Sequence, residues 1–413
     1  MTAMVSGFRC RGCESASTTL VLSLGRLPLA NALPPADRRG QPDPVFPLDL
    51  VLCEACTLVQ LAETVPPETL FRDYLYFSSV SETLLGEARV LASRVIAERG
   101  LGADHLVVEI ASNDGYLLRN YKAAGVPVLG IEPARNVAAV AREQHGIPTL
   151  ESFFDRKLAE KLVAEGRRPD VIHAHNVLAH VPDVDGFVAG LACLLAPDGV
   201  VVIEVPYMRD LMDAMAFDTI YHEHVCYFSL TALARLFARH DLGIRELERI
   251  PAQGGSLRLR VAHGADGPRS AIVEALLAEE TRWGAGDPET YRAFGRRIDA
   301  LREELVAQLR ALKGQGRRLA GYGANAKATI LLNHFGIGAD LLDFVADASP
   351  HKLGRLIPGV QIPIASPVRL LEDQPDYVLL LVWNLADEIL RQQDEYRRRG
   401  GHFVRPVPTV TIL

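Results

Sequence analysis

Two regions of this 413-residue chain alternate short apolar runs, rich in β-branched residues, with longer amphipathic segments. In the first region the runs are HLVVEIAS, VLGIEPA, DVIHAHN and VVVIEVP. In the second region they are RRLAGYG, DLLDFVAD, DYVLLLVWN and HFVRPVPTVTIL. Such alternation is typical of parallel sheets covered by helices on both faces. The sequence therefore predicts an α/β protein with two doubly wound sheets, joined by a helical, charge-rich connector at about residues 268–315.

Four of the six cysteines form two pairs ahead of these regions, in CRGC (Cys10, Cys13) and CEAC (Cys53, Cys56). Each two-residue gap lets both thiolates reach one tetrahedral ion, and four thiolates leave no position for water or substrate. A structural zinc site is therefore predicted. The alternative is a pair of redox motifs, which we disfavour because such a motif is expected once, at the start of a helix in a thioredoxin-like unit.

The turn after the first strand, EIASNDGYLL, differs from a dinucleotide-binding GxGxxG turn. Position 111 is Ala, Gly115 is the one glycine in the turn, and Asp114 occupies the place where a pyrophosphate would need a free helix N-terminus. Glu132 closes the second strand, where an acidic residue can bind both ribose hydroxyls. A ligand with a ribose and a cation but no phosphate fits this pattern, and S-adenosylmethionine is such a ligand.

The remaining strands of the first region agree with a methyltransferase. HNVLAHVPD places Asn176 at the carboxyl edge of the sheet and His180 four residues later. GIRELERI and SLRLRVA are joined by the short link PAQGG without a helix, so they are expected to pair antiparallel. A parallel sheet that ends in an antiparallel hairpin is the layout of class I methyltransferases and argues against a nicotinamide dehydrogenase.

The segment FDTIYHEHVCYFS carries two imidazoles, a carboxylate and a phenol in four consecutive positions. In an extended chain His222 and His224 share one face and Glu223 points to the other. Three interpretations remain open at this point: a metal site, a structural histidine pair, and a catalytic base. Imidazole titrates near neutral pH and can accept a proton from a carbon next to a carbonyl, so a base is the interpretation that we favour.

The composition of the chain limits the kinds of partner that it is expected to bind. Apolar residues make up 48% and charged residues 23% of the chain, and no run approaches the ~18 apolar residues of a membrane helix. The formal net charge of −7 disfavours nucleic-acid binding. The N-terminus MTAMVSGFRCRGC lacks the pattern of a secretory signal, so we expect a cytoplasmic protein that binds a small molecule, with no membrane partner and as a monomer.

The order of these motifs resembles that of the nucleotide-sugar C-methyltransferases, which methylate a ring carbon of TDP-4-keto-deoxysugars in antibiotic and cell-surface glycan pathways. The resemblance rests on the paired cysteine motifs with PLAN, on EIASNDGYLL, NVLAHVPD and YHEHVCYFS, and on GGSLR and GYGANAK. The chain departs from the family at Ala111, where Gly is usual, and at Cys226, where Ser is common.

The resemblance implies three domains: a zinc-binding domain (1–70), an S-adenosylmethionine-binding methyltransferase domain (71–265) and a Rossmann-like domain for the sugar nucleotide (266–413). It implies that His224 is the base, with Tyr221, Glu223, His180 and Tyr76 as other catalytic residues. The residues expected at the cofactor are Glu109, Ala111, Asn113, Asp114, Gly115, Glu132, Pro133 and Asn176. Those expected at the substrate are His222, Gly321, Tyr322, Gly323, Ala324 and Lys327.

The residues of Gly321–Lys327 by themselves also predict a phosphate cradle at a strand-to-helix junction. The alternative is a tight packing turn. The family tendency favours TDP as the nucleotide and C3 over C5 as the methylated carbon. Two other functions stay open: a zinc-containing, NAD-dependent oxidoreductase and a non-catalytic scaffold.

Overall fold

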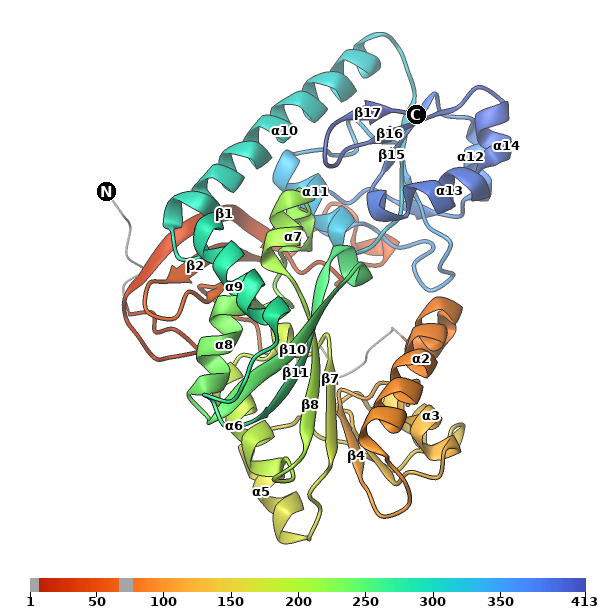
Figure 1. The fold of residues 1–413 in the computed structure, drawn as a ribbon. Coiled ribbons are helices and arrows are strands. Elements are labelled where there is room, and N and C mark those ends of the chain that lie inside the picture. The colour runs from red at the N-terminus through yellow and green to blue at the C-terminus, as the bar shows by residue number, and fades with distance from the viewer. Residues whose placement is uncertain (1–6, 67–76) are drawn as a thin grey trace.

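The computed structural model describes residues 7–66 and 77–413, which form three β-sheets (Figure 1). The C-terminal sheet lies at the top of the view and the middle sheet at the bottom, while the N-terminal sheet lies at the left beside both. Each predicted domain supplies most strands of one sheet. The domain boundaries themselves stay a prediction.

The N-terminal sheet is antiparallel, in the order β1-β2-β3-β9. Its strands are β1 (Thr18–Pro28), β2 (Val45–Cys53), β3 (Val59–Leu61) and β9 (Cys226–Tyr227). Strand β1 follows the first cysteine motif, β2 runs into the second and β3 follows it, whereas β9 comes from the middle of the sequence. The segment with the two imidazoles is therefore fastened at its end to the N-terminal sheet.

The middle sheet has the order β10-β11-β8-β7-β4-β5-β6. Its strands are β4 (Val107–Ile110), β5 (Val128–Ile131), β6 (Thr149–Leu150), β7 (Val171–His175), β8 (Val200–Pro206), β10 (Leu242–Ile250) and β11 (Ser256–His263). The first five are parallel, and the predicted antiparallel pairing of β10 with β11 is confirmed. Strand β6 has only two residues, too few to form a recognisable apolar run, and was not predicted.

Helices cover both faces of the middle sheet and form a separate apolar core on each. They are α2 (Glu82–Arg99), α3 (Leu118–Ala123), α4 (Arg135–Glu143), α5 (Arg156–Ala164), α6 (Val184–Leu194) and α8 (Leu230–Ala238). The short helix α7 (Met208–Asp213) packs instead in the core between the N-terminal and C-terminal sheets. Short polar side chains begin several of them: Asp155, Asp183 and Ser229 each accept a hydrogen bond from an N–H of the first turn. This local sequence fixes where the loops at the sheet's edge end.

The predicted connector consists of α9 (Ala271–Trp283) and α10 (Pro288–Gly314). Asp287 caps α10, and Pro288 occupies its first turn, where a missing N–H costs nothing. One apolar face runs the length of α10 and packs against β1 (Figure 1). Helix α10 thus joins the N-terminal and C-terminal sheets into one core, while α9 packs on the middle sheet.

The C-terminal sheet has the order β14-β13-β12-β15-β16-β17, parallel except for β17. Its strands are β12 (Leu319–Tyr322), β13 (Val345–Ala346), β14 (Ile364–Ala365), β15 (Tyr377–Leu380), β16 (His402–Arg405) and β17 (Thr411–Ile412). The helices around it are α11 (Ala326–Phe335), α12 (Val368–Asp373), α13 (Ala386–Gln392) and α14 (Asp394–Arg398). The second predicted doubly wound sheet is confirmed.

Six short 3-10 turns complete the described elements: η1 (Ala36–Arg38), η2 (Ser78–Val80), η3 (Leu178–His180), η4 (Phe217–Thr219), η5 (Ala252–Gly254) and η6 (Trp383–Leu385). The turn η4 begins the segment FDTIYHEHVCYFS (217–229), called the histidine segment below. Its Phe217 is fully buried and stacks on Phe335 of α11, with ring centroids 5.0 Å apart. The histidine segment therefore contacts helix α11 of the C-terminal region at its start and the N-terminal sheet at its end.

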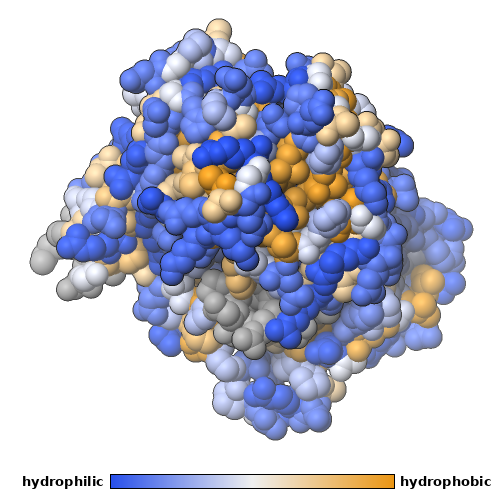
Figure 2. All heavy atoms as spheres, turned by 90° about the horizontal axis from the view of Figure 1, so that it is seen from below, coloured by the Kyte–Doolittle hydropathy of each residue, from blue (hydrophilic) through white to orange (hydrophobic). Residues whose placement is uncertain are grey.

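Within residues 7–66 and 77–413, no helix combines the length and the apolar character needed to cross a membrane. The face seen from below is mostly hydrophilic, with apolar side chains gathered mainly right of its centre (Figure 2).

Candidate active site and zinc site

A cavity of about 1220 Å³ lies where the three sheets meet. It is lined by Asn31 from the N-terminal region, by the carboxyl ends of β4, β5, β7 and β8, by the segment from 216 to 227, and by residues 325–327 and 351–355 of the C-terminal region. Small-molecule pockets usually measure about 300–1,000 Å³. This cavity therefore has room for two ligands side by side.

Glu132, at the end of β5, lines one end of the cavity. Its Oε2 accepts a hydrogen bond from the backbone N–H of Asn113 at 3.0 Å, and its Oε1 accepts one from Ala134 at 2.8 Å. Burial raises the pKa of this carboxyl group. Each oxygen keeps a second lone pair, so the carboxylate is held by the backbone and can still accept hydrogen bonds from two hydroxyl groups.

The turn after β4 is built from left-handed backbone at non-glycine residues. Ala111 has φ 56° and Asn113 has φ 50°, and both line the cavity. Glycine is the residue that adopts this region without strain. The chain therefore holds a strained alanine at 111, where the resemblance leads one to expect Gly.

Of the predicted cofactor residues, Ala111, Asn113, Glu132, Pro133 and Asn176 line the cavity. The other three do not, and they lie behind the turn instead. Glu109 is 1% exposed and neither carboxyl oxygen has a partner, while Asp114 accepts a hydrogen bond from the N–H of Ser79. A Cβ on Gly115 would approach Cγ1 of Ile147 to 2.8 Å, so this glycine is needed for packing.

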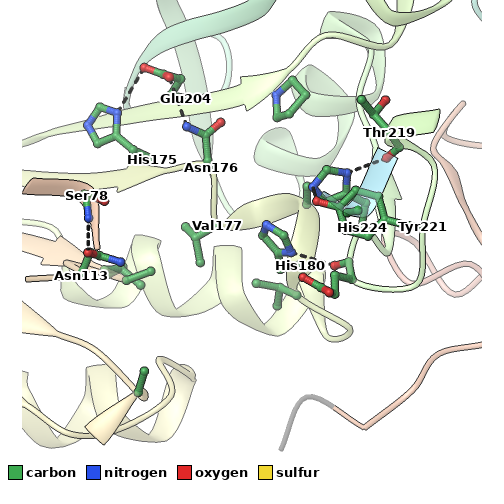
Figure 3. Close-up of a pocket in the computed structure, with 18 of the residues that line it drawn as sticks. Ser78, Asn113, His175, Asn176, Val177, His180, Glu204, Thr219, Tyr221 and His224 are labelled. Carbon is green, nitrogen blue, oxygen red and sulfur yellow. Dashed lines mark hydrogen bonds and ion pairs between the residues drawn. The ribbon is translucent and has the colours of Figure 1, made fainter. Parts of the chain in front are cut away.

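His224 lines the cavity, and one of its ring nitrogens is held by a hydrogen bond to the backbone (Figure 3). Its Nδ1 lies 2.9 Å from the carbonyl oxygen of Thr219, which can only accept, so Nδ1 carries the proton. The lone pair of the neutral ring is then on Nε2, 3.1 Å from the hydroxyl of Tyr221. Burial, with a contribution from the neighbouring His180, lowers the pKa of His224 to about 3. The resting ring is therefore neutral, with Nε2 unprotonated.

The other polar residues of the segment are oriented by the backbone and by the N-terminal region. His180 donates from Nδ1 to the carbonyl oxygen of Glu223 at 2.7 Å, and its ring meets that of His224 edge-on with centroids 4.9 Å apart. The side chain of Glu223 accepts a hydrogen bond from Nδ2 of Asn31 at 2.7 Å. All of these residues line the cavity, so the structure brings His180, Tyr221, Glu223 and His224 together as predicted.

His222 is placed elsewhere. It is 2% exposed, its Nε2 lies 3.2 Å from the carbonyl oxygen of Phe46, and it does not line the cavity. The expectation that His222 and His224 share one face of an extended segment is wrong. The N–H of His224 donates to the carbonyl of Tyr221 at 2.9 Å, which closes a turn and separates the two rings. Tyr76, the remaining predicted catalytic residue, lies outside the described residues.

The cavity is lined by the end of the predicted phosphate cradle and not by its glycines. Gly321, Tyr322, Gly323 and Ala324 do not line the cavity, whereas Lys327 does. Gly323 has φ 98°, and a Cβ there would come within 2.5 Å of Val382, so the tight packing turn left open as an alternative describes this glycine better.

Lys327 extends into the cavity from the first turn of α11. Its Nζ lies 4.7 Å from the centre of the Trp383 ring and 3.3 Å from Oδ1 of Asn384. Burial lowers the pKa of this ammonium group. His351, Lys352 and Arg355 line the same end of the cavity.

Two residues that were not predicted contribute to the site: Asn31 lines the cavity, and Asp218 lies behind it. Asn31 is part of the PLAN motif, which supported the family resemblance but was not predicted to contribute to the site. Asp218 is fully buried and accepts a hydrogen bond from Nε1 of Trp383 at 2.7 Å, tying the residue before Thr219 to the C-terminal region. Burial raises the pKa of Asp218 to about 6. No spacing rule relates positions so far apart, so only the fold could find this contact.

The four predicted zinc ligands come together. The Sγ atoms of Cys10 and Cys56 are 3.5 Å apart, as are those of Cys13 and Cys53, and all four lie within 4.8 Å of one another. A tetrahedral zinc ion with Zn–S bonds of about 2.3 Å needs sulfur atoms roughly 3.8 Å apart, which this cluster fits. Nε2 of Gln60 donates to Sγ of Cys10 at 3.1 Å and orients that ligand.

The seven-stranded middle sheet, with its antiparallel hairpin and a ligand cavity at the carboxyl ends of its strands, defines a class I methyltransferase fold. Comparison with known proteins agrees with this class. Residues 10–71 match the family described as "Putative zinc binding domain", residues 85–247 match "Methyltransferase domain", and residues 251–408 match "C-methyltransferase C-terminal domain".

The C-methyltransferase NovU of Streptomyces niveus is 35% identical over 406 residues, which cover 98% of this chain and 96% of that protein. The chain therefore belongs to the C-methyltransferase family, which confirms the predicted family and enzyme class. The family, the fold and the four-cysteine cluster support the predicted cofactors, S-adenosylmethionine and zinc, and favour methyl transfer over the oxidoreductase and scaffold alternatives.

More distant similarities are confined to part of the chain. A ubiquinone biosynthesis O-methyltransferase of Bartonella bacilliformis is 30% identical over 97 residues, or 24% of this chain and 39% of that protein. Among solved structures, magnesium protoporphyrin IX methyltransferase of Synechocystis with bound SAM is 14% identical and covers 44% of this chain and 79% of its own, with a TM-score of 0.34.

Proposed function

We propose that this chain transfers a methyl group from S-adenosylmethionine to the ring carbon next to the ketone of a TDP-linked 4-keto-deoxysugar, at C3 in preference to C5. The observation that carries the proposal is the lone pair on Nε2 of His224, which is fixed by the Thr219 carbonyl inside a cavity with room for two ligands. The family assignment supplies carbon as the methyl acceptor.

The donor would occupy the end of the cavity at Glu132. Ala111, Asn113, Pro133 and Asn176 lie at the same edge of the sheet, and Figure 3 shows Asn113 and Asn176 on the side opposite His224 and Tyr221. S-adenosylmethionine supplies an electrophilic methyl group when bound. The chain contributes acceptors for hydroxyl and ammonium groups here, and the first turn offers no cradle for a phosphate.

His224 would remove the proton from the carbon next to the ketone. The C–H bond breaks, the proton moves to Nε2, and the electron pair forms an enolate whose charge develops on the keto oxygen. The Thr219 carbonyl then accepts a hydrogen bond from an imidazolium in place of a neutral ring, which stabilises the protonated base. The Tyr221 hydroxyl is close enough to Nε2 to turn toward the enolate oxygen.

The sugar nucleotide would extend toward the C-terminal sheet. Lys327, Lys352 and Arg355 line that end of the cavity together with His351. A diphosphate is a suitable partner for this group of cationic side chains. Glu223 and His180 would contact the sugar. The monomeric state and the cytoplasmic location remain predictions.

Two measurements test the function. Incubation of the purified chain with S-adenosylmethionine and a panel of TDP-4-keto-deoxysugars should add one methyl mass to a member of the panel, at C3. In heavy water without donor, the wild type should exchange the proton next to the ketone. His224→Asn should lower turnover by about 10²–10⁴-fold and abolish this exchange while both ligands still bind.

His222→Asn is the matched control, because His222 lies in the same turn but does not line the cavity. It should keep the wild-type exchange rate. Exchange that survives in His224→Asn but is lost in His180→Asn would make His180 the base, and exchange that survives in both would exclude histidine as the base.

A further inference from the structure

A chain of buried polar side chains crosses the core of the middle sheet and ends at the cavity. The hydroxyl of Tyr121 lies 2.7 Å from Nε2 of His173, and Nδ1 of His173 lies 2.9 Å from Nε2 of His175. Nδ1 of His175 lies 3.4 Å from Oε2 of Glu204. Tyr121 and His173 are completely buried, and the proposed chemistry uses neither.

The direction of every hydrogen bond in this chain follows from the charge of Glu204. Despite the cost of its burial, His175 and Arg258 lower the pKa of this carboxyl group to about 2, so it accepts and cannot donate. Nδ1 of His175 must therefore carry a proton, and in the neutral form of this ring Nε2 then accepts from Nδ1–H of His173. Nε2 of His173 is then left to accept from the hydroxyl of Tyr121.

Glu204 is fixed on its other side as well. Nε and Nη2 of Arg258 donate to Oε2 at 3.2 and 3.0 Å, and Nη1 of the same side chain lies 3.7 Å from Glu248. Oε2 thus faces three N–H groups, whereas Oε1 accepts from a single side chain, that of Asn176.

Asn176 follows β7, at the point where the connections of the sheet diverge to either side. Its backbone has φ 53°, its N–H donates to the carbonyl of Glu204 at 2.8 Å, and its Nδ2 donates to Oε1 at 3.2 Å (Figure 3). A carboxylate accepts only from the nitrogen of an amide, so the amide cannot flip. Oδ1 of Asn176 is consequently the atom left for the cavity, and it is buried without a partner.

We propose that Glu204, held by the Tyr121–His173–His175 chain and by Arg258, is a positioning residue that aims Oδ1 of Asn176 at the α-ammonium group of the methyl donor. The inference rests on the proposed function, since it takes S-adenosylmethionine as the donor. Glu132 and Asn176 follow β5 and β7, which flank β4, so they are about two strand spacings, roughly 10 Å, apart. A ribose at Glu132 therefore directs the amino-acid arm of the donor toward Asn176.

The test compares two ligands by calorimetry. S-adenosylhomocysteine carries the ammonium group, and 5′-methylthioadenosine has the same adenosine but no amino-acid arm. Glu204→Gln can present an amide nitrogen to Asn176 and lose the fixed orientation. It should weaken S-adenosylhomocysteine on the order of 10-fold or more and 5′-methylthioadenosine by less than about 2-fold. Asn176→Ala should act alike, and the double variant should be no worse than either single one.

Tyr121→Phe removes only the far end of the chain and provides a milder variant should Glu204→Gln fold poorly. It should weaken S-adenosylhomocysteine alone, by a few-fold. Glu280→Gln is the matched control: Glu280 is also a buried carboxylate, accepts hydrogen bonds from the backbone N–H groups of Leu230 and Thr231 and does not line the cavity. It should lower thermal stability without changing the ratio of the two affinities.

Equal weakening of both ligands in Glu204→Gln would reduce Glu204 to a structural role and overturn the proposal. A change confined to the KM of the sugar nucleotide would overturn it too, because Asn176 would then face the methyl acceptor. Failure of the wild type to bind S-adenosylhomocysteine would instead refute the proposed function from which this inference starts.

Discussion

The middle and C-terminal sheets both place a carboxylate after their second strand, and in both it accepts an N–H from the turn after the first strand. In the middle sheet Glu132 accepts from Asn113, and in the C-terminal sheet Asp347 accepts from Ala324 at 2.7 Å. The surroundings differ. Asp347 is also 3.1 Å from Nζ of Lys352, whereas Glu132 has no ion-pair partner among the described residues.

The difference indicates how one fold serves two kinds of ligand. A carboxylate bound only by backbone amides keeps its charge and spare lone pairs for hydroxyl groups, which suits a ribose and a nearby cation. Asp347, paired with Lys352, repels an anion less, and Lys327 lines the same end of the cavity as Lys352. We therefore expect the donor at the middle sheet and the phosphates at the C-terminal sheet.

The largest predicted effect is at the zinc site, which lies in the N-terminal region and outside the two sheets compared above. Cys53→Ser should release zinc and destabilise the fold by more than about 3 kcal/mol, because a four-thiolate site couples metal binding to folding. Cys193→Ser, a half-buried cysteine outside the cluster, should change neither. Metal analysis should find one zinc per wild-type chain, and less than about half an equivalent in protein purified without chelators would contradict the site.

The second prediction separates the two carboxylates. Glu132→Ala should weaken S-adenosylmethionine by about 10²-fold or more, since two charge-assisted hydrogen bonds to the ribose, each worth roughly 1.5–3 kcal/mol, are lost. Asp347→Ala is the matched change in the other sheet and should leave donor affinity unaltered. Calorimetry measures both, and unchanged donor affinity in Glu132→Ala would refute the assignment.

The third prediction is the reverse test at the C-terminal end. Lys327→Met keeps the apolar stem but removes the charge, so it should weaken TDP by about 10-fold and leave S-adenosylhomocysteine unaffected. Lys313→Met, which removes a lysine paired with Asp343 outside the cavity, is the control. If TDP binds Lys327→Met as tightly as the wild type, the phosphates do not lie at this end.

The smallest effect is an opposite pH dependence at the two ends. Burial raises the pKa of Glu132 above its ordinary 4.5, so donor affinity should fall as the solution becomes acidic, beginning above that pH. Burial lowers the pKa of Lys327 below its ordinary 10.5, so TDP affinity should fall as the solution becomes alkaline, beginning below that pH. Calorimetry across a pH series should show the alkaline loss vanish in Lys327→Met.

Much of this could be predicted from the sequence. The apolar runs that became β4, β5, β7 and β8, the hairpin of β10 and β11, the zinc cysteines and Glu132 all depend on neighbours within a few residues or on fixed spacings. Asp347, the acid that closes the second strand of the C-terminal sheet, was not predicted, although DFVADAS contains it directly after the apolar run.

The site residues that were predicted wrongly share a cause. An extended YHEH segment would have put His222 beside His224, but one backbone hydrogen bond from His224 to Tyr221 turns the chain and buries His222 against Phe46. Glycine at 323 suggested a phosphate cradle, yet it is required by the approach of Val382. Local sequence does not reveal which contact a turn or a glycine satisfies.

The sequence by itself determined the class of fold, the metal ligands and the chemical groups available for catalysis, because periodicity and ligand spacing act over short stretches of chain. Only the tertiary structure decided which of those groups share a cavity. Asn31 reaches Glu223, and Trp383 reaches Asp218, across separations of 192 and 165 residues. Such contacts arise from the packing of three sheets around one segment, and that packing depends on the summed burial of many side chains, which no single motif encodes.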